Sequence, residues 1–186
     1  MQTQSKNSLK IENIVASAKV TDAMDPADLA EKIPGAEYDR KRFPGAVVRL
    51  TDPKIALLLF ASGKVVFTGA KSLEDLNKGV LRLRDLLRKL GIKTPDKIPV
   101  TVQNIVTSAD LGATINLNKI MLGLNLERVE YEPEQFPGLV YRIEEPKVVV
   151  LLFGSGKLII TGGRVPEDAQ KAVAKIQSDL KKIGVL

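Results

Sequence analysis

The feature of this sequence that most constrains its fold is an internal repeat. The segment that begins at Phe43 recurs 93 residues later, at Phe136. Both copies contain Phe-Pro-Gly, an arginine at matching depth, Pro-Lys, Leu-Leu-Phe and Ser-Gly-Lys, and each is followed by Thr-Gly. So many identities at one fixed offset indicate that the chain consists of two copies of one structural unit.

Each copy predicts the same order of elements, namely a strand, a short helix, four strands and a long helix. The opening strands are predicted at 11–17 and 102–108, where Ile-Val follows an asparagine. The later strands are predicted at 36–39, 46–51, 54–61 and 64–69 in the first copy and at 128–132, 139–144, 147–154 and 157–162 in the second. Their close spacing, with Pro or Gly in the breaks, is typical of an antiparallel meander.

The helix boundaries follow from capping residues and apolar spacing. Asp25 followed by Pro26 predicts the start of a short helix, and Asn116 predicts the start of its counterpart. Long helices are predicted over 73–90 and 166–183, because apolar residues recur there at spacings of three and four. Runs of strands followed by a helix indicate an α+β fold with an antiparallel sheet covered on one face.

The central strands are apolar on both faces, which a sheet covered on one side does not require. In the first copy, Leu58 and Phe60 alternate with Leu57 and Leu59. An antiparallel sheet with one solvated face normally alternates apolar and polar residues. We therefore expect a wide apolar face that is left for a partner. Packing of two sheets face to face and a homodimer contact are the alternatives.

Composition excludes several classes of function. The chain has no cysteine and no histidine, which rules out disulfides, Cys/His metal sites and catalysis by thiol or imidazole. Carboxylate, lysine, tyrosine and hydroxyl groups remain for chemistry, so an enzyme is possible but poorly supplied, and we assign no catalytic residue, metal site or cofactor from the sequence. The longest apolar runs are too short to span a bilayer, so no membrane partner is expected. The first residues are polar, and residues 1–8 are expected to form a short disordered arm.

The charge is unevenly distributed along the chain. Residues 1–93 carry 17 Lys or Arg and 11 Asp or Glu, whereas residues 94–186 carry 11 of each. The net charge of +6 therefore lies in the first half. A basic half joined to a neutral half favours a polyanionic partner on one side, with a basic solvated surface as the alternative.

The repeated motifs resemble those of a known family. Two copies of Asn-Ile-Val, Phe-Pro-Gly, Arg, Pro-Lys, Leu-Leu-Phe, Ser-Gly-Lys and Thr-Gly, each ended by an amphipathic helix, resemble the conserved core of the TATA-binding protein family. The resemblance covers residues 9–184, and the short arm is similar to the archaeal form. It implies tandem repeats that form a ten-stranded antiparallel saddle-shaped sheet with four helices on the convex face. The first repeat would span 9–93, the linker 94–99 and the second repeat 100–186.

The resemblance also implies a function and partners. The family are general transcription factors, not enzymes, and the concave face would lie in the minor groove of double-stranded A·T-rich promoter DNA. The chain would bend this DNA and recruit transcription factor B and, through it, RNA polymerase. The expected location is the nucleoid in the cytoplasm of an archaeon, or the nucleus in a eukaryote.

Individual positions match the family's DNA contacts. The aromatic residues that would insert between base steps are Phe43, Phe60, Phe136 and Phe153. The residues that would contact base edges are Asn13, Val15, Leu58, Val66, Thr68, Asn104, Val106, Leu151, Ile159 and Thr161. The residues that would contact phosphates are Arg42, Arg49, Lys64, Lys71, Arg142, Lys157 and Arg164. Arg164 stands where the family usually has Lys, and Gly163 where it usually has Ala.

The repeats differ most just before Phe-Pro-Gly, where the first is basic and the second is acidic. Glu132 and Glu134 of the acidic copy are the residues expected to contact transcription factor B, with a solvated loop or a metal-binding or catalytic carboxylate pair as alternatives. Glu12 replaces the Gln often found before the first Asn and is not expected to contact DNA, because a carboxylate cannot donate a hydrogen bond to a base.

Two other functional classes remain open from the sequence. One is an accessory DNA-binding domain of the same fold, as is attached to some nucleases and glycosylases. The other is a structural homodimer that buries the apolar face, and a homodimer could also form only in the absence of DNA.

Overall fold

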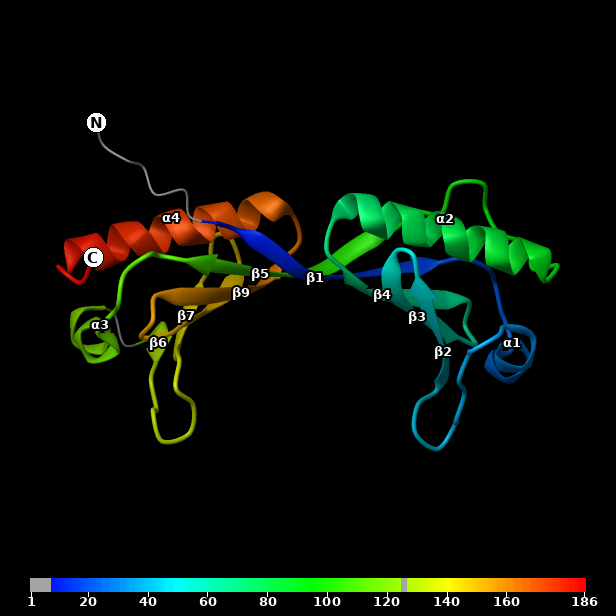
Figure 1. Cartoon of the computed structure of the whole chain (residues 1–186), viewed down its shortest axis with the longest axis horizontal. Helices are drawn as coiled ribbons and strands as arrows, with labels where there is room; N and C mark the ends of the chain where they lie inside the picture. Colours follow the sequence, from blue (N-terminus) through cyan, green and yellow to red (C-terminus); the bar gives the residue numbers. More distant parts are fainter. Residues whose placement is uncertain (1–7, 125–126) are drawn as a thin grey trace. The chain divides into compact units, whose positions relative to one another are not determined.

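The structure is a computed structural model that describes residues 8–124 and 127–186. The predicted arm therefore lies outside the described residues except for Ser8. In the first repeat the elements are β1 (Lys10–Lys19), α1 (Pro26–Lys32), β2 (Gly45–Thr51), β3 (Lys54–Phe60), β4 (Lys64–Ala70) and α2 (Leu73–Lys89) (Figure 1). In the second they are β5 (Thr101–Asp110), α3 (Leu117–Gly123), β6 (Val129–Glu130), β7 (Leu139–Ile143), β8 (Val148–Leu152), β9 (Lys157–Gly163) and α4 (Pro166–Lys182).

The strands form an antiparallel sheet, as the sequence predicts. The hydrogen-bonded order is β2-β3-β4-β1-β5-β9-β8-β7-β6. Nine strands are present in the described residues where ten were expected, because the strand predicted at 36–39 is reduced to a single bridge between Glu37 and Val47. The α+β class with four helices is confirmed.

The predicted helix starts are confirmed by their capping bonds. The Asp25 carboxylate accepts a hydrogen bond from the Ala27 amide at 3.0 Å, and Pro26 is the first residue of α1. The Asn116 side chain accepts from the Lys119 amide at 3.1 Å. These side chains satisfy amides that the first helical turn leaves without a backbone acceptor.

The chain divides into two compact units whose borders lie inside β1 and β5. One unit contains the described residues up to Glu12 together with Asn104–Leu186, and the other contains Asn13–Gln103. Each repeat thus contributes the start of its first strand to the other unit. Gln103 donates to Ser17 at 2.9 Å within one unit, and Ser108 donates to Glu12 at 2.8 Å within the other.

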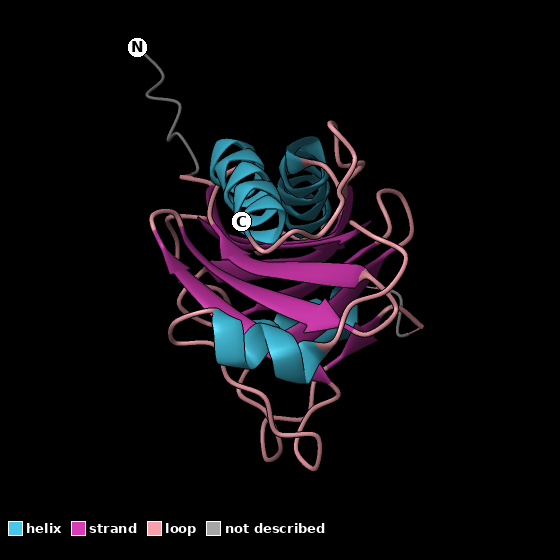
Figure 2. Cartoon of the chain, turned by 90° about the vertical axis from the view of Figure 1, so that its right-hand side faces the viewer, coloured by secondary structure: helices cyan, strands magenta, loops and turns pink. Residues whose placement is uncertain are grey.

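In the unit that contains the first repeat, α2 covers one face of the strands. Leu57 and Leu59 of β3 and Leu83 and Leu87 of α2 are completely buried. Figure 2, in which this unit faces the viewer, shows the long helix on one side of the strands. The alternate side chains of β3, Leu58 among them, are only partly buried. The helix therefore covers one face, and the opposite apolar face stays uncovered, as the sequence indicates.

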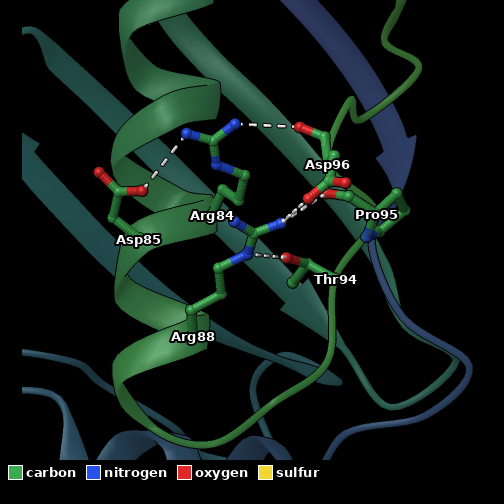
Figure 3. A network of polar contacts seen from close by, with 6 residues as sticks. All are labelled: Arg84, Asp85, Arg88, Thr94, Pro95 and Asp96. Atoms are coloured by element: carbon green, nitrogen blue, oxygen red, sulfur yellow. Dashed lines mark hydrogen bonds and ion pairs between the residues drawn. The ribbon is translucent and has the colours of Figure 1, made fainter.

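Two arginines of α2 form hydrogen bonds with the segment that follows this helix (Figure 3). Arg88 donates to the Thr94 hydroxyl at 3.0 Å and to the Asp96 carboxylate at 2.8 Å. Arg84 donates to the Asp96 backbone carbonyl at 2.9 Å. The hydrogen bonds from the side chains of Arg84 and Arg88 hold the start of the predicted linker against α2.

In the unit that contains the second repeat, α4 is held to the sheet by a polar contact as well as by apolar packing. The Tyr141 hydroxyl donates to Asp179 at 2.7 Å, and Lys175 donates to the same carboxylate oxygen at 3.1 Å. Burial raises the pKa of Tyr141, and the hydrogen bond and charge of Asp179 raise it further. Burial also raises the pKa of Asp179, but the bonds from Tyr141 and Lys175 and the charges of Lys175 and Lys182 outweigh it, so the net pKa is lowered.

We predict that Tyr141→Phe destabilises the protein by about 1–2 kcal/mol, because Asp179 loses a short hydrogen bond in a largely buried position. Since the folded pKa of Asp179 is lowered, its contribution is fully present above the unfolded pKa of about 4 and is lost as pH falls further, through the lowered folded pKa. Urea unfolding at pH 7 and pH 3 should therefore show a larger difference between wild type and variant at pH 7 than at pH 3. Tyr38→Phe, at the partly buried position before the first Phe-Pro-Gly, is the control. An equal loss in both variants would contradict the assignment.

Candidate nucleic-acid interface

The uncovered strand face carries partly exposed apolar side chains at equivalent places in both units. In one unit Leu58 of β3 lies opposite Val66 of β4 and Val47 of β2. In the other, Leu151 of β8 lies opposite Ile159 of β9, which is 36% exposed. Val15 and Val106, also predicted to contact bases, are partly buried on β1 and β5. The predicted apolar contacts therefore gather on the open face of each unit.

Each unit places two phenylalanine rings against each other at the edge of this face. The Phe43 and Phe60 ring centroids are 5.5 Å apart at 61°, and those of Phe136 and Phe153 are 5.9 Å apart at 67°. Both are edge-to-face pairs, a favourable aromatic geometry. The fifth phenylalanine, Phe67, is completely buried in the core. The four matched rings thus differ in environment from the unmatched one.

The glycine of each Phe-Pro-Gly motif has no side chain, and the ring pair packs in the space that a side chain there would fill. A Cβ atom on Gly138 would lie 2.7 Å from the Phe136 ring and 3.0 Å from the Phe153 ring. On Gly45 it would lie 3.1 Å from Phe43, 3.2 Å from Phe60 and 3.0 Å from the Leu59 carbonyl. The motif is therefore explained by packing, because any side chain at the glycine would displace a ring.

The predicted polar contacts are also brought together in pairs. Asn13 of β1 donates to the Thr68 hydroxyl of β4 at 3.4 Å, and Asn104 of β5 donates to Thr161 of β9 at 3.2 Å. Each asparagine also accepts a short bond from the glycine that follows the threonine. The two asparagine–threonine pairs lie in separate units yet share one geometry.

Two of the predicted phosphate-binding arginines carry internal partners that the sequence analysis did not identify. Arg49 lies 3.3 Å from Glu37, and Arg142 lies 3.3 Å from Glu130. Both pairs are exposed, and each glutamate precedes its arginine by the same number of residues, which is the signal that could have revealed them. Exposed ion pairs contribute little stability. The arginines can therefore exchange a carboxylate for a phosphate at low cost.

The remaining predicted cations lie on the surface of the two units. Arg42 forms a 3.6 Å ion pair with Asp39 in the loop before the first Phe-Pro-Gly. Arg42 and the other members of this set are exposed, the others being Lys64, Lys71, Lys157 and Arg164. Their charges are open to solvent and to an anionic partner.

The loops before the two Phe-Pro-Gly motifs extend away from the helices of their own units (Figure 1). In the second repeat the Glu132 backbone carbonyl accepts hydrogen bonds from Gln135 and Phe136, both at 2.9 Å, and the side chains of Glu132 and Glu134 are exposed. The corresponding loop of the first repeat exposes Arg40, Lys41 and Arg42. Equivalent loops therefore present opposite charge to solvent.

Glu12 lies in a hollow beside one of the ring pairs. This hollow of about 690 Å³ is lined by Phe153, Ile159 and Lys157 as well as by Glu12 and Ser108. The Glu12 carboxylate accepts from Ser108 at 2.8 Å and lies 3.8 Å from Lys10. Glu12, which is not expected from the sequence to contact DNA, thus borders the predicted contact surface.

Within the described residues no three carboxylates gather in a way that could hold a metal ion. None of the helices formed by these residues is long and apolar enough to cross a membrane. The two units instead each combine an open apolar strand face, a partly exposed ring pair, amide and hydroxyl groups, and surface cations. Such a surface can contact flat apolar groups and a polyanion at once, which is the combination that a nucleic acid offers.

Comparisons with known proteins point to one family. The family model described as "Transcription factor TFIID (or TATA-binding protein, TBP)" matches residues 8–90 and 99–183. TATA-box-binding protein E of Halobacterium salinarum is 54% identical over 184 residues, covering 99% of each chain. The TATA-box-binding protein of Archaeoglobus fulgidus is 52% identical over 178 residues, covering 96% of this chain and 97% of its own. The solved structure of Methanococcus jannaschii TBP has a TM-score of 0.85 and 47% identity, covering 94% of this chain and 99% of that one.

We predict that Gly138→Ala separates the second ring pair without unfolding the protein, because the added Cβ meets the exposed Phe136 ring rather than backbone. The change in unfolding free energy should stay below about 1 kcal/mol, since a surface ring can move aside. Nuclear Overhauser contacts between the Phe136 and Phe153 rings should weaken or disappear. Gly154→Ala is the control, because its Cβ would meet nothing closer than the Ile115 carbonyl at 3.6 Å. Unchanged ring contacts in Gly138→Ala would contradict this packing.

Proposed function

Because this chain belongs to the TATA-binding protein family, we propose that it is a general transcription initiation factor that binds the minor groove of A·T-rich promoter DNA and bends it. The observation that carries the proposal is the pair of edge-to-face phenylalanines, present in each unit beside an uncovered apolar strand face. The family is one of transcription factors, and the proposed mechanism is binding and deformation of DNA, without a chemical step.

The first step of the mechanism is insertion of the ring pairs. Proteins that bind the minor groove insert apolar side chains between base steps, and this family is a known example. The partly exposed rings of Phe43 and Phe60, and those of Phe136 and Phe153, would enter the base stack at the two ends of the site. The cost of unstacking would be offset by contact between the widened groove and the apolar face, including Leu58 and Leu151. Flexible TA steps lower that cost and contribute specificity.

The second step is positioning by charge. Arg49 and Arg142 would exchange Glu37 and Glu130 for DNA phosphates, and the exposed lysines would add further phosphate contacts. Such contacts orient the protein without reading the sequence and make the affinity fall with salt. The division into a first repeat (9–93), a linker (94–99) and a second repeat (100–186) is part of the proposal. So is location at the nucleoid in the cytoplasm of an archaeal cell.

The third step is recruitment of a second factor. Glu132 and Glu134 form an exposed acidic loop in the second repeat, and we propose that transcription factor B binds there and brings RNA polymerase. The equivalent basic loop of the first repeat would repel the same partner surface and attract DNA. The difference in charge supports a single binding position for the factor.

A homodimer in the absence of DNA is the second candidate, because the open strand face is apolar in both units. Light scattering with and without a TATA duplex separates the two functions. A dimer that dissociates on DNA is compatible with the main proposal. A dimer that persists unchanged, with no bend in the duplex, would contradict the main proposal and support the homodimer function.

We predict that Phe43→Ala or Phe136→Ala weakens binding to a TATA duplex by about tenfold and reduces the bend, since loss of one stacked ring removes on the order of 1–3 kcal/mol. Fluorescence transfer between dyes at the ends of the duplex measures the bend. Leu122→Ala, which truncates a side chain that is 90% exposed on α3, is the control and should bind and bend normally. Wild-type transfer efficiency in either phenylalanine variant would refute the wedge assignment.

We predict that Glu132→Arg prevents assembly of the ternary complex with transcription factor B but leaves binary DNA binding intact, because the charge of the loop is reversed. Mobility shifts with and without transcription factor B measure both steps. Glu31→Arg, an equal charge reversal at an exposed position of α1, is the control. Normal ternary assembly by Glu132→Arg would exclude this loop as the binding position.

A further inference from the structure

The Thr-Gly pairs that follow each repeated segment have a structural role beyond the threonine. Gly69 lies near the end of β4 and has a φ of 101°, and Gly162 lies near the end of β9 and has a φ of 98°. At these places the register between β1 and β4 shifts between Ile14 and Ala16, and that between β5 and β9 shifts between Ile105 and Thr107. The amide of Gly69 donates to Asn13 Oδ1 at 2.7 Å, and the amide of Gly162 donates to Asn104 Oδ1 at 2.6 Å.

These short bonds determine which end of each asparagine side chain faces outward. A backbone N–H can only donate, so the side-chain atom that it contacts must be the carbonyl oxygen. The Nδ2 group then occupies the other end of the amide, where it donates to the Thr68 hydroxyl at 3.4 Å or the Thr161 hydroxyl at 3.2 Å. The Oδ1 atom of each asparagine is therefore turned toward the glycine inside the protein, and its N–H donors are turned toward the threonine.

The threonine hydroxyl adds a group of mixed polarity. A hydroxyl that accepts a bond from Nδ2 still has its own hydrogen to donate and a second lone pair to accept with. In the second unit the Thr161 hydroxyl also lies 3.4 Å from Asn104 Oδ1, which leaves both Nδ2 hydrogens available in that arrangement. In either case the asparagine, held by the glycine, is the member of the cluster that presents its N–H donors to a partner on the open face.

We propose that the backbone N–H groups of Gly69 and Gly162 are positioning groups that lock Asn13 and Asn104 with their donors outward and thereby select A·T over G·C pairs. This inference rests on the proposed minor-groove function. Adenine and thymine present only acceptors in that groove, whereas guanine adds an N2 amino donor. To accept a hydrogen bond from guanine, the side-chain amide would have to turn over. This rotation would place the Nδ2 hydrogens against the N–H group of the glycine. The rotation would break two bonds, each contributing about 1 kcal/mol.

Glycine is required at these places by backbone conformation rather than by lack of space. A Cβ atom on Gly69 would lie no closer than 3.4 Å to its nearest neighbour, the Lys54 carbonyl, and on Gly162 it would lie 3.3 Å from the Lys147 carbonyl. Side chains rarely adopt φ values near 100°. The Thr-Gly pair is therefore explained as a hydroxyl donor followed by the one residue whose backbone N–H can reach the asparagine.

The first test exchanges the outward donor for an acceptor and keeps the glycine bond. In the double variant Asn13→Asp with Asn104→Asp, each carboxylate can still accept from glycine, but its second oxygen faces outward. Binding is compared on duplexes with A·T, I·C or G·C at the central pairs, because inosine lacks the N2 amino group and I·C otherwise resembles G·C. The ratio of I·C to G·C affinity isolates this amino group, and repulsion between carboxylate and phosphate cancels in the ratio.

We expect the wild type to bind I·C about tenfold more tightly than G·C. The Asp variant should lose or reverse this ratio of affinities. The ratio of the double variant Asn13→Ala, Asn104→Ala should lie between those of the wild type and the Asp variant. An Asp variant that keeps the wild-type ratio would overturn the inference. A wild type that does not prefer A·T over G·C would overturn the proposed function itself, so the two failures are distinguishable.

The second test addresses the glycine N–H directly. In-vitro translation with glycolic acid at positions 69 and 162 replaces each N–H by an ester oxygen and adds no side chain. We expect the I·C to G·C ratio to fall by about threefold to tenfold, since each amide loses its anchor. The same replacement at Gly112, whose amide donates to Asp110 Oδ1 at 2.8 Å, is the matched control and should leave the ratio unchanged. An unchanged ratio in the 69/162 ester would refute the positioning role.

A measurement on the unmodified protein keeps the inference falsifiable if the ester protein does not fold. Scalar coupling across the hydrogen bond between the Gly69 nitrogen and the Asn13 Cγ carbon, and between Gly162 and Asn104, should be detectable by NMR both free and on DNA. Absence of the coupling in the DNA complex would mean that the asparagines are released on binding, which contradicts the proposal.

Discussion

The structure depends on strands that are apolar on both faces but are covered by helices on one. Leu57 is completely buried under α2, whereas Leu58, the next residue, remains partly exposed on the opposite face. Complete burial of a leucine contributes about 1.5–3 kcal/mol, so the helix-covered layer that contains Leu57, Leu59, Leu83 and Leu87 stabilises the unit without help from the opposite face. The residues of the open face are then not needed for this packing, and the proposed function accounts for their apolar character.

Three backbone features place the functional side chains on this face. The glycine of Phe-Pro-Gly lets two rings pack where a Cβ would collide with them. The glycine of Thr-Gly turns an amide toward an asparagine, and the register shift in the neighbouring strand brings that amide within 2.7 Å. The donors and rings are thus held by the sheet itself, and a partner does not have to supply the free energy to order them.

Much of this fold follows from the sequence, and the exceptions have physical reasons. Asp25 and Asn116 mark the helix starts, because capping is a local interaction. The strand predicted at 36–39 is only a bridge between Glu37 and Val47. In the second repeat Val129 pairs with Tyr141 in β7 and is 3% exposed, whereas Ala36 stands at the equivalent position of the first repeat and has a smaller apolar side chain to bury. The Tyr141–Asp179 bond and the asparagine–glycine bonds join residues far apart in the chain. They depend on strand register, which no local pattern determines.

The near-identity of the two repeats raises the question of direction. The minor groove presents A·T and T·A alike, and the two asparagine–threonine–glycine clusters have the same geometry. Base reading by this surface therefore cannot distinguish the two orientations of a site. Direction must come from positions where the repeats differ, namely the basic and acidic loops before Phe-Pro-Gly and the exchange of Gln103 for Glu12. The loops lie outside the strand face, so under the proposed function a protein partner would chiefly set the orientation, and the strands would determine only where on the DNA the complex forms.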